Sequence, residues 1–60
     1  MTKERKEQAI LLLKHCQNGI VIQQGVALSK GGIKRYRKLQ DTWGLMNEII
    51  DLISEAPEDD

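Results

Sequence analysis

The stretch IKRYRKLQDTWGLMNEIIDLI, residues 33–53, decides the fold expected of this 60-residue chain. Its apolar side chains recur at intervals of 4, 3, 4 and 3 residues, at Leu39, Trp43, Met46, Ile50 and Ile53. This heptad-like spacing predicts an α-helix with one apolar seam. The helix either runs from about residue 30 to 55 or breaks in two near residues 41–42, and Pro57 ends helical structure.

A further helix is expected at the start of the chain, where residues 2–17 are strong helix formers without Gly or Pro. Thr2 can serve as its N-cap, and Asn18-Gly19 indicates its end, because both residue types adopt the left-handed conformation that terminates helices. The segment that follows, residues 20–32, is ambiguous. Its β-branched residues favour a hairpin of two short strands, residues 20–22 and 26–28, and the competing interpretation is a short helix followed by a turn.

The expected fold is all-α, with three to four short helices in one domain over residues 1–56 and a disordered acidic tail over residues 57–60. Tyr36 and Trp43 are the only aromatic residues, so the core of such a short chain is thin and a homodimer is expected. The lone Cys16 cannot form a disulfide within the chain. No apolar run is long enough for a secretion signal or a membrane span, which predicts a cytoplasmic protein without a membrane partner.

The charged residues are divided between the two parts of the chain. Residues 1–38 hold all nine basic side chains and two acidic ones, a net charge of +7, and residues 39–60 hold the other seven acidic side chains, a net charge of −7. Five of the nine cations fall within residues 30–38. Such asymmetry indicates a polyanion-binding region, so nucleic acid is the first partner to consider.

The stretch GIVIQQGVALSKGGIKRYR, residues 19–37, has the spacing of a helix-turn-helix unit. With Ala27 at the turn, the five apolar positions of the unit are filled by Ile22, Val26, Leu28, Ile33 and Tyr36, and Ser29 caps the second helix. The stretch resembles the turn and recognition helix of helix-turn-helix DNA-binding proteins. It is most similar to the Fis-type C-terminal element, in which an Asn (here Asn18) precedes the first helix and a Gly-Leu pair (here Gly44-Leu45) lies near the end of the basic helix.

The resemblance implies a small transcriptional regulator of bacterial, plasmid or phage type that places the second helix in the major groove of duplex DNA. The candidate DNA-binding residues are Ser29, Lys30, Lys34, Arg35, Arg37 and Lys38. Lys34 or Arg35 would read guanine edges. The other cations would hold phosphates.

Other interpretations stay open. The candidate dimer or partner interface comprises Tyr36, Trp43, Met46, Ile49, Ile50 and Ile53. Through the Trp43–Ile53 face the chain could instead be a helical inhibitor or adaptor that docks on another protein, with the basic run merely solvated. A helical-hairpin dimer that binds RNA is a further alternative. In an antiparallel dimer, residues 34–38 of one helix would face the acidic residues 48–55 of the other. We expect no catalysis, cofactor or metal, because His15-Cys16 has no further ligands at metal-binding spacing.

Overall fold

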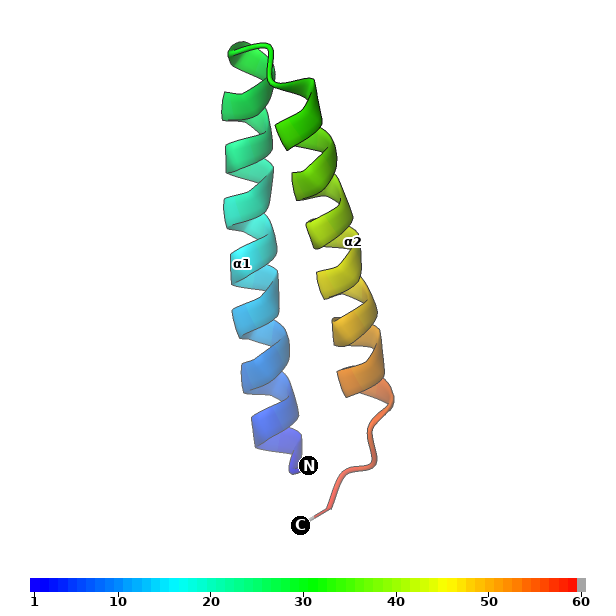
Figure 1. Cartoon of the computed structure of the whole chain (residues 1–60). Helices are drawn as coiled ribbons and strands as arrows, with labels where there is room; N and C mark the ends of the chain where they lie inside the picture. Colours follow the sequence, from blue (N-terminus) through cyan, green and yellow to red (C-terminus); the bar gives the residue numbers. More distant parts are fainter. Residues whose placement is uncertain (60) are drawn as a thin grey trace.

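The computed structural model describes residues 1–59 and shows two long α-helices that lie side by side and run in opposite directions (Figure 1). Helix α1 spans Lys3–Ser29 and helix α2 spans Ile33–Glu55, and these residues form no strand. The all-α prediction is confirmed. The hairpin has two helices where three to four were expected. It is elongated, with Cα extents of 49 × 14 × 8 Å.

Helix α1 begins as predicted but ends much later. The Thr2 hydroxyl oxygen accepts a hydrogen bond from the backbone N–H of Arg5 at 3.2 Å, which confirms the N-cap. The predicted stop at Asn18-Gly19 is wrong, and residues 20–28 are helical and not strands. Packing explains both corrections, because Gln17, Ile20, Gln24 and Ala27 continue the 3–4 spacing of the side that faces α2. Tertiary contact thereby overrides the local preference for a stop or a strand.

The chain turns at residues 30–32, not at Ala27. Ala27 is a buried residue inside α1, and Gly31 takes the positive φ of 73° that the reversal requires. The N–H of Gly32 donates to the Ala27 carbonyl at 2.7 Å, and a Cβ on Gly32 would lie 3.4 Å from that same oxygen. Ser29 does not cap the second helix. It ends α1, where its hydroxyl donates to the Val26 carbonyl at 2.8 Å, and the N-cap of α2 is Gly32.

Helix α2 is continuous through Asp41-Thr42 and Gly44, so of the two alternatives the single helix is the one observed. It ends at Glu55, two residues before Pro57. The prediction that helical structure stops at the proline is confirmed.

A single seam of side chains joins the helices. On α1 it comprises Lys6, Ile10, Leu13, Gln17, Ile20, Gln24 and Ala27. On α2 it comprises Tyr36, Leu39, Trp43, Met46, Ile50 and Ile53. In the described residues only Ala27 and Ile50 are buried apolar residues, and Gln17 and Gln24 are buried polar ones. The hairpin therefore has a thin core with two polar positions in it.

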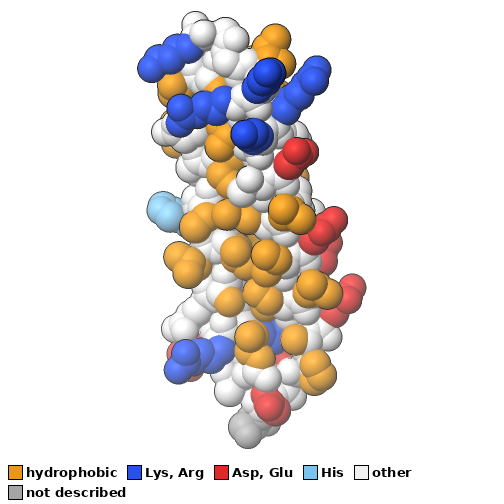
Figure 2. All heavy atoms as spheres, viewed as in Figure 1, with side chains coloured by type: hydrophobic (Ala, Val, Ile, Leu, Met, Phe, Trp, Pro, Cys, Tyr) orange, Lys and Arg blue, Asp and Glu red, His pale blue; other side chains and the backbone are white. Residues whose placement is uncertain are grey.

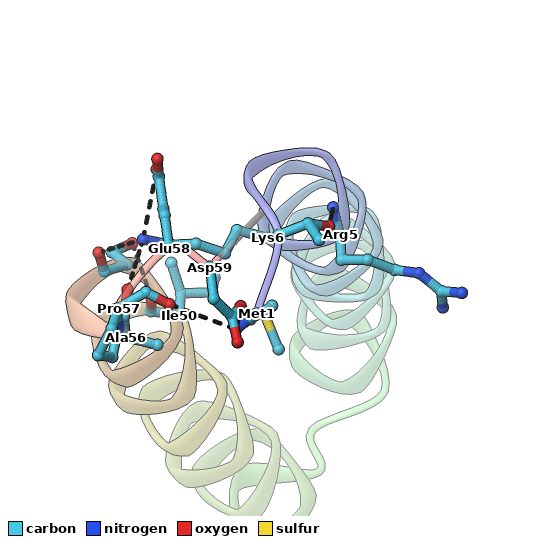
Figure 3. A network of polar contacts seen from close by, with 10 residues as sticks. Met1, Arg5, Lys6, Ile50, Ala56, Pro57, Glu58 and Asp59 are labelled. Atoms are coloured by element: carbon cyan, nitrogen blue, oxygen red, sulfur yellow. Dashed lines mark hydrogen bonds and ion pairs between the residues drawn. The ribbon is translucent and has the colours of Figure 1, made fainter.

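The open end of the hairpin is closed by polar contacts (Figure 3). The Lys6 ammonium donates to the carbonyls of Ser54 at 3.0 Å and Ala56 at 2.8 Å, so this cation satisfies the last carbonyls of α2. The amino group of Met1 pairs with the Asp59 carboxylate. That hydrogen bond and the positive charge hold the pKa of Asp59 below its usual value. The predicted tail begins here: residues 57–59 lie beside the chain start, and residue 60 is outside the described residues.

Candidate nucleic-acid interface

The basic end of the hairpin is the first candidate site, and we define it by Lys30, Lys34, Arg35, Arg37 and Lys38. These cations lie in the turn and in the first two turns of α2, and all five are exposed. Figure 2 shows blue side chains gathered where the chain turns. Among residues 1–59 the ion pairs are Met1 with Asp59 and Lys6 with Glu58, both at the opposite end of the hairpin. The basic end thus has no carboxylate partner among the described residues.

The cations surround the outside of α2 and do not form one narrow stripe. At 3.6 residues per turn, positions 34, 35, 37 and 38 spread over roughly 160° of the helix surface. Tyr36 and Leu39 occupy the remaining side, which packs on α1. The first turn of α2 has no acidic residue, so the positive end of its helix dipole adds to the same field. This arrangement suits contact with several phosphates. The sixth predicted residue, Ser29, lies beside the cations with its hydroxyl bonded to its own helix.

The predicted dimer or partner interface is divided by the structure. Five of its six residues, Tyr36, Trp43, Met46, Ile50 and Ile53, lie in the seam and are buried or half-buried against α1. The sixth, Ile49, is outside the seam and 44% exposed. Most of the predicted interface is therefore used for packing within the chain.

A second apolar surface, the flank face, lies beside the seam. We define it by Leu12, Cys16 and Gly19 on α1 and by Leu45, Ile49 and Leu52 on α2. Each of these residues immediately precedes a seam residue. One residue back is a turn of about 100° around a helix. Because the two right-handed helices run in opposite directions, the same step on each leads to the same face of the pair. Figure 2 shows apolar side chains gathered over the middle of both helices on one face.

The opposite face has a different composition. The residues that immediately follow the same six seam residues are Lys14, Asn18, Val21, Asn47, Asp51 and Ser54, of which five are polar. On the flank face, by contrast, Leu12, Leu45 and Leu52 are 65%, 60% and 67% exposed. Leu11, Val21 and Leu28 are also exposed, but they lie on α1 alone, so the flank face is the side on which both helices present apolar side chains.

Three seam residues were not anticipated from the sequence as structural elements: Lys6, Gln17 and Gln24. The Gln17 amide donates to the Trp43 carbonyl at 3.1 Å, and the Gln24 amide donates to the Gln40 side-chain oxygen at 2.7 Å. Their signal is the 4–3 spacing that they share with Ile10, Leu13, Ile20 and Ala27. It becomes visible only when polar residues are admitted to the pattern.

No group of three or more His, Cys, Asp or Glu side chains among residues 1–59 could hold a metal ion. Within this described part of the chain there is no pocket, and neither helix is long and apolar enough to cross a membrane. Comparison of the chain with protein families, with curated proteins and with solved structures finds no match.

Proposed function

We propose that this chain is a small DNA-binding regulator, active in the cytoplasm, that holds duplex DNA through the basic end of the hairpin. The observation that carries the proposal is the group of five exposed cations that lack carboxylate partners among residues 1–59. Cations of this kind contact phosphates and release the counterions condensed on the duplex, which drives binding without regard to sequence.

The mode of contact should differ from that of a helix-turn-helix unit. In such a unit the recognition helix enters the major groove, which is about 12 Å wide. Here α2 lies alongside α1 over its whole length, and two helices of about 10–12 Å diameter are together too wide for that groove. We therefore assign phosphate contact to the basic end as its main role, and base reading to no more than the outermost side chains, such as Lys34.

The test is salt-dependent binding to a random duplex, followed by fluorescence anisotropy. If all five cations of one basic end contact phosphates, the logarithm of the binding constant falls with the logarithm of salt concentration with a slope of about −4.5. The double variant Lys34→Ala, Arg37→Ala should lower the steepness by about two and weaken binding at low salt. Lys3→Ala with Lys14→Ala is the matched control, because it removes the same charge away from the basic end.

Two results would count against this proposal. Absence of duplex binding at low salt would refute the proposal that the chain binds DNA. Tighter binding of an RNA duplex or hairpin than of DNA would favour the RNA-binding alternative.

A homodimer belongs to the same proposal, and the exposed flank face supports it. An adaptor that docks on another protein would also use an apolar face, and it stays the second candidate. The two differ in a simple measurement: the adaptor is monomeric by sedimentation equilibrium in the absence of its partner, and the regulator is dimeric.

A further inference from the structure

We propose that a second copy of the chain packs on the flank face to form a four-helix bundle, with the two basic ends at opposite ends of the bundle and Cys16 at the two-fold axis. The proposal rests on the homodimer proposed above and is independent of DNA binding. Three features of the hairpin support it: the flank face, the charge distribution and the register of the two helices.

The flank face is apolar and exposed to water in the single hairpin. A hairpin with two buried apolar residues has little to hold its helices together, and it leaves large side chains such as Leu12, Leu45 and Leu52 mostly in water. Gly19 points to the same face. A glycine inside a helix is destabilising, and a Cβ at this position would meet nothing within 4 Å in the hairpin. The absence of a side chain at Gly19 leaves room for another helix to approach the flank face closely.

The charges at the two ends of the hairpin determine the orientation of the second copy. Two hairpins stacked on the flank face by a two-fold axis have their turns either at the same end or at opposite ends. With turns together, ten cations would meet at one end of the bundle. With turns at opposite ends, the basic end of each copy lies beside the end of α2 of the other, where Glu58 and Asp59 are paired within their own chain and Glu55 is in no ion pair among residues 1–59. Arg35 and Lys38 each precede a seam residue and so lie on the flank side, towards the end of α2 that holds Glu55. The second arrangement is selected because it separates the ten cations and places each basic end near Glu55 of the other copy.

The midpoints of the two helices determine the register in which the two copies pack. Cys16 is the middle residue of α1 and Gly44 is the middle residue of α2. The hydrogen bond from Gln17 to the Trp43 carbonyl places these two midpoints at the same level of the hairpin. Full overlap of two copies then sets the axis at this level. Helix α1 packs antiparallel on α1 of the second copy with Cys16 facing Cys16, and Leu45 faces Leu45. The small side chains of Cys16 and Gly19 allow the helices to approach closely there.

The test is disulfide formation in the full chain without DNA, under mild oxidation with copper phenanthroline. Helices in contact have axes 8–10 Å apart, so facing cysteines at a crossing come within the Cα separation of a disulfide, about 4.4–6.8 Å. The wild-type chain should give a covalent dimer. So should Cys16→Ser with Leu45→Cys, because residue 45 also lies at the axis.

The matched control is Cys16→Ser with Ile22→Cys, because Ile22 is exposed on the far side of α1. It should cross-link about tenfold more slowly or less, since it relies on collision and lacks the high effective concentration within a dimer. Equal rates for Cys16 and the Ile22→Cys control overturn the proposal. The proposal is also overturned if cross-linking occurs only in a mixture of the wild-type chain with the Cys16→Ser, Leu45→Cys variant. That product is expected with turns together, where α1 of one copy faces α2 of the other. Loss of DNA binding with normal cross-linking would instead count against the proposed function alone.

Discussion

Replacement of Gln24 by leucine should make the protein more stable, which is an unusual expectation for a residue that is buried and hydrogen-bonded. Gln24 is 8% exposed and donates to the side chain of Gln40 at 2.7 Å. Gln40 itself is exposed, so water can replace the lost partner. The variant gives up one side-chain hydrogen bond of about 0.5–1.5 kcal/mol. Burial of a leucine in its place contributes about 1.5–3 kcal/mol.

The balance is a gain of about 1 kcal/mol in the free energy of unfolding, which in a domain of this size raises the Tm by about 4–8 °C. Thermal and urea unfolding followed by circular dichroism measure it, at one fixed protein concentration because association shifts apparent stability. Gln8→Leu is the matched control. Gln8 is exposed on the same helix, so its replacement should stay within about 0.5 kcal/mol of the wild type. A loss of stability for Gln24→Leu would show that the hydrogen bond between the two glutamines stabilises the hairpin by more than burial of a leucine does.

Two further predictions follow from the ends and the faces of the hairpin. Lys6→Met keeps the apolar stem but removes the donor to the Ser54 and Ala56 carbonyls, so it should lower the free energy of unfolding by about 1.5–3 kcal/mol. The control Lys3→Met, at an exposed lysine, should have little effect on the free energy of unfolding. Urea unfolding measures both variants, and equal effects would refute the capping role of Lys6. Gly25→Ala should raise stability by about 0.5–1 kcal/mol through helix propensity, because a Cβ there meets open space on the face opposite the flank face. Gly19→Ala has the same gain in helix propensity but crowds the proposed dimer contact. Sedimentation equilibrium should therefore show weaker self-association for Gly19→Ala and not for Gly25→Ala. Equal self-association of the two variants would contradict close packing at Gly19.

The parts of the fold that the sequence predicted are those with one dominant local signal. The apolar repeat from Leu39 onward predicted helical structure, with a break near residues 41–42 left open, and α2 follows the repeat unbroken to Glu55. Thr2 and Pro57 act at helix ends through their own side chains, so their roles could be inferred without knowledge of the rest of the chain.

The prediction failed where local and tertiary preferences disagree. Gln17 and Gln24 interrupt the apolar pattern of α1, so Asn18-Gly19 and the β-branched residues after it dominated the interpretation. In the hairpin both glutamines satisfy their amides across the seam, which removes the penalty of burying them. The turn was misplaced for a related reason. The helix-turn-helix spacing predicts the turn at Ala27 and the cap of the second helix at Ser29, although Gly31 supplies the positive φ that reverses the chain.

The two proposals divide the cations of the basic end between two tasks. Arg35 and Lys38 lie on the flank side, where a second copy would bring the end of its α2 with Glu55. Lys30, Lys34 and Arg37 lie elsewhere on that end and stay available to phosphates. In the bundle these two outward groups would be separated by about the length of α1, roughly 40 Å for 27 residues at 1.5 Å per residue. This length is close to the 34–36 Å between successive major grooves on one side of a duplex. A bundle that lies along the duplex could therefore hold phosphates with both ends at once, and the charge separation of the sequence would serve assembly and binding together.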